Sequence, residues 1–345
     1  MELAEAFRLQ GEACAALGSP MYADLLARAA GDIDAGGPVR EVLAGHEDAS
    51  GPSALALRLL GSVHRLVLER GAGALAAYYP SVGGTWEPDG GWTAFRRLVA
   101  EQREPVREWL DRAPQTNEVG RATALYGALL QLPWDLPVRL FEVGTSAGLN
   151  LRADRFGYVD DAGTEFGDPD SPVRLRPAWT GRRLRAEVRP RVVERAGCDL
   201  HPVDPTTTEG RTVLTAYVWP DQEARHERLR SALALAARVP AEVRRETAAA
   251  FVRRLEPAEG ATTVLWHSVM WQYLSPEEQG EVTRRIEQLG SLATQQRPFV
   301  HVRAEPSRRA PGAPHEFLVR MRAWPGGDDL LLGSTAAHGL PTVWE

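Results

Sequence analysis

The fold is decided by one stretch of the sequence, Val138-Arg139-Leu140-Phe141-Glu142-Val143-Gly144-Thr145-Ser146-Ala147-Gly148-Leu149-Asn150-Leu151. Its first six residues form a short, mainly apolar run that predicts a buried strand. Gly144 and Gly148 then bracket a turn whose backbone can approach a ligand, and apolar residues at helical spacing follow it. A strand that enters a helix through glycines places backbone N–H groups at the carboxyl end of a sheet strand. Ligands of open α/β sheets bind at that end.

This turn fits two kinds of chemistry. As Glu142-x-Gly144-x-x-x-Gly148 it is typical of a loop that binds a nucleotide-type ligand, with an acid at the end of the strand. As Gly144-Thr145-Ser146-Ala147-Gly148 it matches the G-x-S-x-G elbow of serine hydrolases. A third interpretation is a strand–helix junction that needs glycine only for its backbone, because short motifs carry little weight alone.

Length and composition indicate a globular protein with a real core. The chain has 345 residues, of which 43% are hydrophobic and 25% charged. A net charge of −6 argues against a broad nucleic-acid surface. No apolar run reaches membrane length, and we see no signal peptide, so we expect a cytoplasmic protein without membrane contact. The two cysteines are far apart and the histidines show no metal-ligand spacing, so no metal site is expected.

The distribution of patterns predicts two domains. Residues 1–135 are expected to form an all-helical N-terminal domain. From residue 136 to 345, strands and helices alternate and end in a hairpin around Pro325, with an insertion at about 157–181. Such alternation predicts an α/β fold with a Rossmann-like, mainly parallel sheet, helices on both faces and a C-terminal antiparallel hairpin.

Within this outline the sequence predicts particular elements. Helices are expected over residues 54–69, 92–110, 117–130, 208–218, 222–238, 242–255 and 276–289, the last with Ser275 as N-cap and Glu278 placed for a capping box. Strands are expected over residues 184–188, 199–205, 262–267, 299–303, 316–324 and 329–334, and a helical turn over residues 190–196.

A nucleotide-type site also needs an acid at the end of the second strand, to hold ribose hydroxyls. Glu187 is the candidate, delayed by the 157–181 insertion. Asp204, at the end of a further strand, could face an adenine amino group. Either acid could equally be an ordinary surface or turn residue.

The stretch 266–274, Trp-His-Ser-Val-Met-Trp-Gln-Tyr-Leu, follows the clearest late strand. His267 is a candidate general base because the unperturbed pKa of histidine lies near neutrality. Trp271 and Tyr273 could stack on a planar substrate. A core histidine beside packing aromatics is the plainer interpretation. The aromatic, glycine-rich loop 78–84, with Tyr79, is a candidate lid.

The stretch Thr116-Asn117-Glu118-Val119-Gly120, followed by a strand and the Glu142 to Gly148 loop, resembles the opening of class I S-adenosylmethionine-dependent methyltransferases, especially those acting on small-molecule oxygens. The resemblance implies that Glu142, Gly144 and Gly148 line the methionine and ribose part of S-adenosylmethionine. Thr145, Ser146 and Asn150 are expected beside them, although many members have glycine where Ser146 stands. The whole chain also resembles an uncharacterised family of high-GC bacteria, which implies no activity.

The sequence thus favours an S-adenosylmethionine-binding protein that methylates a small molecule. One alternative is a serine hydrolase using Ser146 and His338, in the chain order Ser, acid, His. Another is a non-catalytic ligand-binding protein of the same fold. The helical domain could cap the substrate or form the surface of a homodimer.

Overall fold

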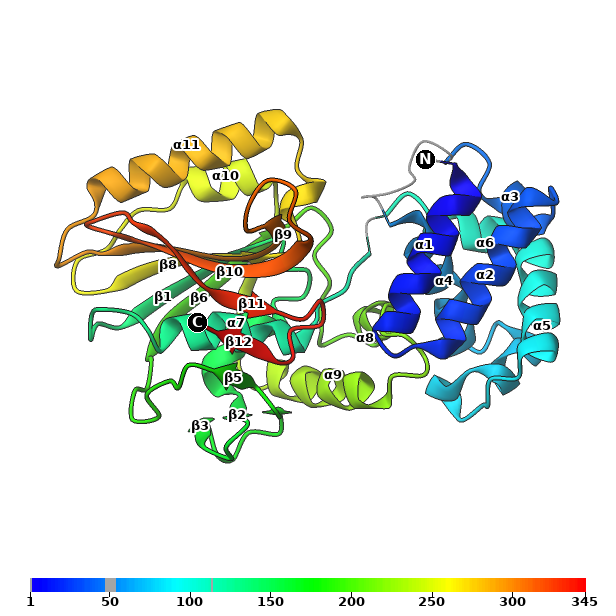
Figure 1. Ribbon diagram of the computed structural model, residues 1–345, viewed down its shortest axis with the longest axis horizontal. Helices are drawn as coiled ribbons and strands as arrows, with labels where there is room; N and C mark the ends of the chain where they lie inside the picture. The colour runs from blue at the N-terminus through cyan, green and yellow to red at the C-terminus, as the bar shows by residue number, and fades with distance from the viewer. Residues whose placement is uncertain (1, 47–53, 113) are drawn as a thin grey trace. The chain divides into compact units, whose positions relative to one another are not determined.

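The computed structural model describes residues 2–46, 54–112 and 114–345. The chain divides into two compact units, drawn in Figure 1. Unit 1 comprises residues 1–116 and 207–227, and unit 2 comprises residues 117–206 and 228–345. This division differs from the expected boundary at 135/136 in two ways: residues 117–135 belong with the sheet, and a later segment returns to the helical unit.

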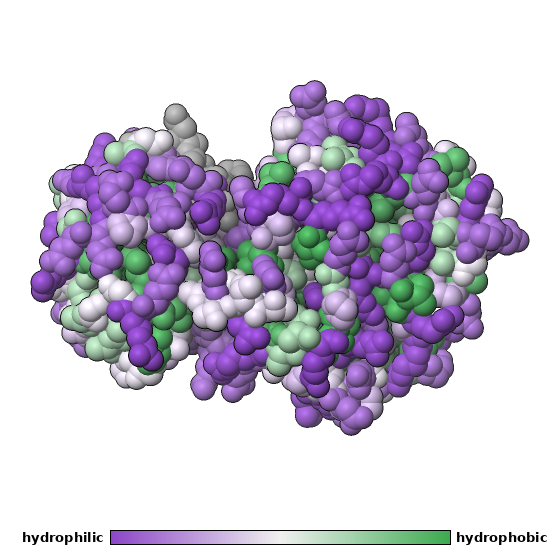
Figure 2. All heavy atoms as spheres, turned by 180° about the vertical axis from the view of Figure 1, so that it is seen from behind, coloured by the Kyte–Doolittle hydropathy of each residue, from purple (hydrophilic) through white to green (hydrophobic). Residues whose placement is uncertain are grey.

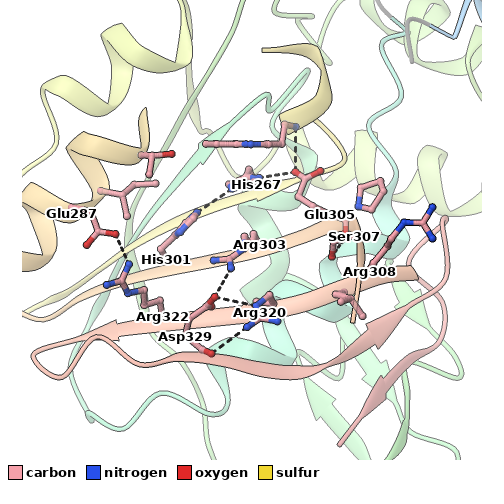
Figure 3. Close-up of a pocket in the computed structure, with 15 residues that line it drawn as sticks. His267, Glu287, His301, Arg303, Glu305, Ser307, Arg308, Arg320, Arg322 and Asp329 are labelled. Atoms are coloured by element: carbon pink, nitrogen blue, oxygen red, sulfur yellow. Dashed lines mark hydrogen bonds and ion pairs between the residues drawn. The ribbon is translucent and has the colours of Figure 1, made fainter. Parts of the chain in front are cut away.

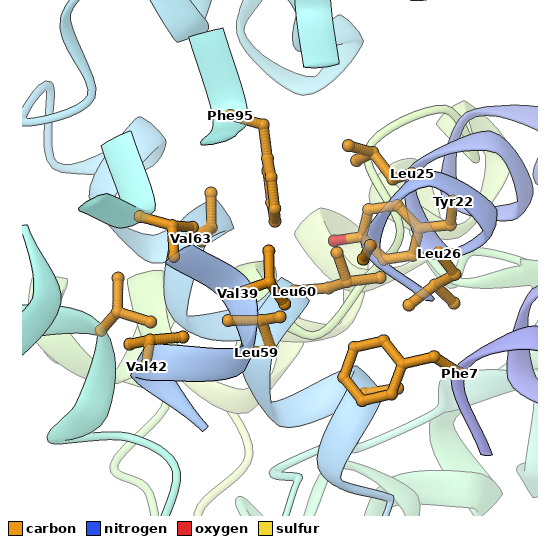
Figure 4. Close-up of a cluster of buried hydrophobic side chains, with 14 of the residues drawn as sticks. Phe7, Tyr22, Leu25, Leu26, Val39, Val42, Leu59, Leu60, Val63 and Phe95 are labelled. Carbon is orange, nitrogen blue, oxygen red and sulfur yellow. The ribbon is translucent and has the colours of Figure 1, made fainter. Parts of the chain in front are cut away.

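Unit 1 is built from helices around one apolar core. They are α1 (Leu3–Ala16), α2 (Pro20–Asp34), α3 (Pro38–Val42), α4 (Leu55–Leu68), α5 (Pro88–Glu101) and α6 (Arg103–Arg107). In α4, Leu59, Leu60 and Val63 are fully buried, as its amphipathic pattern predicts. Figure 4 shows these side chains meeting Phe7 from α1 and Phe95 from α5.

Two expectations for unit 1 are corrected. The single helix expected over residues 92–110 is two helices, because Gln102, between α5 and α6, has φ −116° and ψ 44° and leaves the helical region. The candidate lid at residues 78–84 is packed structure made of η2 (Gly73–Tyr78) and η3 (Pro80–Val82). Tyr79 between them is 0% exposed and belongs to the core of unit 1, so it offers no surface to a substrate.

Helix α8 (Thr208–Ala216) joins unit 1 through close packing on α4. A Cβ atom at Gly61 would lie 2.6 Å from Cε1 of Tyr217, so the ring occupies the space that this glycine leaves. His64 Nδ1 lies 3.0 Å from the carbonyl oxygen of Ala216. Burial lowers the pKa of His64 to about 3, so the ring is a neutral core histidine. Helix α9 (Glu223–Ala236) crosses from unit 1 into unit 2.

Unit 2 contains a nine-stranded sheet with the order β5-β12-β11-β10-β9-β8-β1-β6-β7. Its strands are β1 (Val138–Val143), β5 (Trp179–Gly181), β6 (Val192–Asp199), β7 (Glu242–Arg245), β8 (Thr262–Ser268), β9 (Phe299–Arg308), β10 (His315–Trp324), β11 (Asp329–Thr335) and β12 (Thr342–Trp344). The run from β7 to β9 is parallel, whereas β9, β10, β11 and β12 pair antiparallel in turn. Unit 2 is therefore α/β with a large, mostly parallel sheet.

Helices cover both faces of this sheet, as Figure 1 shows. On one face lie α10 (Ala248–Arg253) and α11 (Pro276–Leu292), which pack on Phe141, Leu265 and Phe299. On the other lie η4 (Val119–Arg121), α7 (Ala122–Leu129) and η5 (Leu149–Arg155). Every residue of α7 is buried, which explains why this segment belongs to the sheet rather than to the helical unit.

Four expected elements around β6 and β7 are wrong. Residues 184–188 are not a strand, residues 190–196 are not a helical turn, and β6 ends at Asp199 rather than running over residues 199–205. Residues 242–255 divide into strand β7 and helix α10. The expected Ser275 N-cap is present and accepts from the Glu278 backbone N–H, but the Glu278 side chain accepts instead from the Ala249 N–H.

The insertion is a small sheet of its own. Strands β2 (Gly157–Val159), β3 (Glu165–Gly167) and β4 (Arg174–Leu175) pair in the order β3-β2-β4, and the next strand, β5, joins the edge of the large sheet. Tyr158 stacks on both Tyr126 and Trp179, with ring centroids 4.6 and 5.1 Å away. This aromatic stack attaches the insertion to α7.

The surface is mainly polar on the face that Figure 2 shows, with apolar side chains in small, scattered groups. Within residues 2–46, 54–112 and 114–345, no helix combines the length and the apolar character needed to cross a membrane.

Candidate functional site

The loop after β1 adopts a backbone that few residues other than glycine tolerate. Gly144, Ser146 and Gly148 have φ values of 68°, 54° and 67°. A Cβ atom at Gly144 would lie 2.7 Å from Cβ of Met270, so the segment after β8 lies directly against this loop. Gly144 is therefore required both for its left-handed conformation and for this close approach.

The loop lies at the point where the order of strand addition to the sheet reverses. Strand β1 pairs in parallel with β6 on one side and with β8 on the other. The chain adds β6 and β7 on the first side, and then returns to add β8 and β9 on the second. The carboxyl end of β1 is thus a topological switch point, the position at which open α/β sheets leave a crevice for ligands.

Most backbone amides of the loop already have partners. The N–H groups of Thr145 and Gly148 donate to the carbonyl oxygens of Cys198 and Thr145, at 3.1 and 2.8 Å. Leu149 N–H donates to Oδ1 of Asn117 at 2.9 Å. Ser146 N–H donates to Oδ2 of Asp199 at 2.9 Å. The loop is consequently a rigid wall rather than a cradle of unpaired N–H groups for a phosphate.

Asp199 is a candidate site residue that the sequence interpretation missed. It is the last residue of β6, the strand beside β1, and is only half-buried. Its second oxygen, Oδ1, accepts from His201 N–H at 2.9 Å. A carboxylate offers about four lone-pair positions, so two remain for a ligand. The signal was available in the sequence, since Asp199 directly follows the small buried residues 196–198.

Neither Glu187, predicted to hold ribose hydroxyls, nor Asp204, predicted to face an adenine amino group, lies at the end of a strand beside the glycine loop. Glu187 precedes β6 and lines a hollow with Trp134 and Pro137, at the amino end of β1 and opposite to the glycine loop. Asp204 is exposed in the turn after β6, where the backbone N–H and hydroxyl of Thr206 donate to its Oδ1 at 2.8 and 2.6 Å. The cause is the extent of β6 along the sequence: it covers Val192–Asp199, whereas strands were expected over residues 184–188 and 199–205.

Glu142 is buried and fully engaged within the protein. Its Oε2 accepts from the Thr145 hydroxyl at 2.5 Å, and its Oε1 accepts from the indole N–H of Trp266 at 3.1 Å. Burial raises the pKa of Glu142 to about 8, against the lowering effect of these two hydrogen bonds. The side chains of Glu142 and Thr145 therefore hold the loop in shape from below.

The segment 117–120, which carried the methyltransferase resemblance, supports the other side of the loop. Besides the Asn117 contact, the side-chain amide of Asn150 donates to the carbonyl oxygen of Glu118 at 3.2 Å. Asn150 is 2% exposed, and its Oδ1 has no hydrogen-bond partner among the described residues. Helix η5 after the loop is a 3-10 helix rather than an α-helix. The Gly148 carbonyl oxygen accepts from Leu151 N–H and from the Arg152 guanidinium, which blocks the usual i+4 bond.

A second cluster of polar side chains lies on the α11 face of the sheet, around His267 (Figure 3). His267 Nδ1 lies 2.6 Å from Oε1 of Glu305, and its Nε2 lies 3.0 Å from Nε2 of His301. His267 is 1% exposed and uses both ring nitrogens. His301 and Glu305 escaped the sequence interpretation. Their only signal was the presence of polar residues at every second position of an otherwise apolar strand.

The remaining candidates are dispersed. Trp271 stacks on His267 with ring centroids 5.2 Å apart. Tyr273 is 42% exposed. His338 lies between β11 and β12, with its carbonyl oxygen against Gly120. Among the described residues no group of three or more histidine, cysteine or acidic side chains could hold a metal ion.

Comparison with known proteins identifies a family but no activity. No curated protein and no solved structure matches the chain. A family model described as an uncharacterized protein conserved in bacteria (DUF2332) matches residues 4–344 and thus nearly the entire chain, which belongs to this family.

Proposed function

We propose that unit 2 binds S-adenosylmethionine at the carboxyl end of β1 and transfers its methyl group to a small molecule. The observation that carries the proposal is the Asp199 carboxylate. It stands at the end of β6, beside the glycine loop at the switch point, and keeps acceptor capacity for two further hydrogen bonds. An acid at this position of a Rossmann-like sheet holds the two hydroxyls of a ribose.

The use of the loop amides favours a ligand without phosphates. A dinucleotide requires unpaired backbone N–H groups to bind its pyrophosphate. In this loop, by contrast, four backbone N–H groups donate to acceptors within the protein, those of Thr145, Ser146, Gly148 and Leu149. The adenosyl group and amino-acid tail of S-adenosylmethionine contain no phosphate. The Oδ1 atom of Asn150, to which no described residue donates, adds a buried acceptor close to the same loop.

When bound, S-adenosylmethionine supplies an activated methyl group. The residues of this chain then have mainly a positioning role, because alignment of donor and acceptor can account for much of the barrier to such a transfer. Gly144 lets the loop turn tightly against Met270, Asp199 holds the ribose, and Glu142 with Thr145 fixes the loop through a hydrogen bond.

Serine hydrolysis remains the second candidate, and one observation favours it. Ser146 has φ 54°, and a strained turn of this kind presents the nucleophile in a G-x-S-x-G elbow. Against it, β1 is the first strand in the described part of the chain, whereas the nucleophile strand of that fold normally follows several others.

Titration calorimetry with S-adenosylhomocysteine tests the proposal. We expect the wild-type protein to bind it and Asp199→Asn to bind it about 10- to 100-fold more weakly, as loss of charged hydrogen bonds implies. The asparagine retains an oxygen for Ser146 N–H. Asp170→Asn, at an exposed position of the insertion, is the matched control. The proposal is abandoned if the wild type does not bind at millimolar ligand, or if both variants bind equally.

A further inference from the structure

A cavity of about 450 Å³ lies between α11 and strands β9, β10 and β11 (Figure 3). One wall is formed by alternate residues of β9, namely His301, Arg303, Glu305 and Ser307. None of the residues 142–150 of the glycine loop lines it, so it is distinct from the proposed nucleoside site.

On one side of the cavity, the ionisable side chains of Glu305, His267 and His301 form a hydrogen-bonded chain. Glu305 Oε1 accepts from His267 Nδ1 and from the backbone N–H groups of Met270 and Trp271, at 2.6, 3.2 and 3.4 Å. One of the two facing Nε2 atoms must donate to the other across 3.0 Å, and we assign the proton to His301 Nε2, which makes His267 Nε2 the acceptor. This leaves a lone pair on Nδ1 of His301, to which no described residue donates.

The environment keeps His301 in this neutral form. Burial lowers its pKa well below the usual range, and His267, Arg303 and Arg322 lower it further. Val269, which precedes the two amides that hold Glu305, has φ 50°. Such a conformation is a real outlier for a β-branched residue, and outliers of this kind are common at ligand sites.

The other side of the cavity has a surplus of positive charge. Arg303 Nη2 and Arg320 Nε both donate to Oδ2 of Asp329, at 2.7 and 3.1 Å. Two guanidinium groups thus share one carboxylate, and their side chains remain 27% and 29% exposed. Arg322, by contrast, forms an ion pair with a separate acid, Glu287. Guanidinium groups with spare donors bind carboxylates through paired hydrogen bonds.

The spacing of the two sides limits the size of a ligand. His301 and Arg303 are two residues apart on one strand, so their Cα atoms are separated by roughly 6.6 Å. A ligand whose two polar groups are separated by a few carbon atoms at most can reach both. Trp271, Ile286, Pro306 and Leu318 give the cavity an apolar wall for its carbon skeleton.

We propose that this cavity binds a small organic carboxylate that also carries a hydroxyl or amino group. Arg303 and Arg320 bind the carboxylate, and His301 accepts a hydrogen bond from the second group. His267 and Glu305 are positioning residues that orient His301. The proposal does not depend on nucleoside binding at the β1 loop.

Calorimetry with mandelate and phenylacetate, which differ by one hydroxyl group, tests this site. We expect mandelate to bind in the millimolar range or tighter, and phenylacetate at least 3-fold more weakly. Arg320→Gln should weaken the binding of both mandelate and phenylacetate about 10-fold or more. His301→Phe should leave phenylacetate binding unchanged and remove the preference for mandelate. Arg297→Gln, at an exposed position outside the cavity, is the control.

Inorganic phosphate forms a further arm of the experiment. If phosphate binds more tightly than both acids and still requires Arg320, the cavity is an inorganic oxyanion site and the carboxylate assignment is wrong. Absence of binding by either acid at 20 mM, or binding that Arg320→Gln does not alter, overturns the proposal. Arg303→Gln replaces Arg320→Gln if the latter does not fold.

Discussion

Glu142 and Trp266 are register partners on β1 and β8, and the Trp266 indole N–H donates to Oε1 of Glu142 at 3.1 Å. This bond joins two central strands at the end where the glycine loop begins. Glu142 is 3% exposed, and its carboxyl group also accepts from the Thr145 hydroxyl. A residue that the sequence suggests as a ligand contact is thus, in the structure, a group that supports the glycine loop.

The raised pKa of Glu142 predicts a specific dependence of stability on pH. The unfolded carboxyl titrates near 4.5 and the folded one at about 8, so the folded state retains a proton that the unfolded state loses. The free energy of unfolding should therefore fall, by at most about 1.4 kcal/mol per pH unit from this group, as pH rises between these values.

Replacing Glu142 by glutamine should remove the fall in the free energy of unfolding that this group causes as pH rises. The stability of Glu142→Gln relative to wild type should increase steadily from pH 5 to pH 8 and level off above it, as measured by urea unfolding at each pH. Glu12→Gln, at an exposed position of α1, serves as the control and should show no such trend. A difference between Glu142→Gln and wild type that is constant with pH would contradict the assignment.

The close approach of Met270 to Gly144 can be separated from backbone strain. Alanine at Gly163, which has φ 86° and no atom of the described residues within 4 Å of its Cβ, should cost about 1–2 kcal/mol from the left-handed conformation alone. Alanine at Gly144, with φ 68°, should cost a further 1–3 kcal/mol because its Cβ overlaps Met270. Denaturant unfolding measures both. Equal costs would mean that the loop can move away from Met270.

Substitution of Ser146 distinguishes the two candidate enzymes. Ser146→Ala keeps the backbone N–H that donates to Asp199 and removes only the hydroxyl. We expect S-adenosylhomocysteine binding to change less than 5-fold and no labelling of wild type by a fluorophosphonate. Labelling of wild type that is lost in Ser146→Ala, and retained in the exposed control Ser291→Ala, would instead establish the hydrolase.

The elements that could be predicted from the sequence are those whose pattern of buried residues is regular along the chain. Strand β8 and helix α11 agree closely with expectation, because every residue from Thr262 to His267 is buried and α11 has a regular apolar stripe. Strand β6 was missed because Glu194 and Arg195 interrupt its apolar pattern. Their charges are satisfied by Arg139 and Asp154, which are distant in sequence. Strand β7 is an edge strand of mainly charged residues and carries no hydrophobic signal.

These omissions explain what could be predicted of the sites. The glycine loop is a local motif, and its conformation follows from its residues. Asp199 was missed because β6 was placed wrongly, so the acid at its end was assigned to Glu187. The cluster of His267, His301 and Glu305 joins residues 34 and 38 positions apart. Such contacts depend on which strands become neighbours, and residue spacing along the chain does not encode that.

The unexpected placement of α8 in unit 1 predicts a reversal of sign at Gly61. Within a helix, replacing glycine by alanine normally stabilises the protein by about 0.5–1 kcal/mol. Gly31→Ala in α2 should do so, because no atom of the described residues lies within 4 Å of its Cβ. Gly61→Ala in α4 should destabilise instead, because the new methyl group overlaps the Tyr217 ring at 2.6 Å. In a Tyr217→Leu background, whose smaller side chain can yield, the same substitution should cost less or become favourable. Denaturant unfolding of the four variants measures this coupling. If Gly61→Ala is as stabilising as Gly31→Ala, residues 207–227 do not pack on α4 and the division of the chain into these two units is wrong.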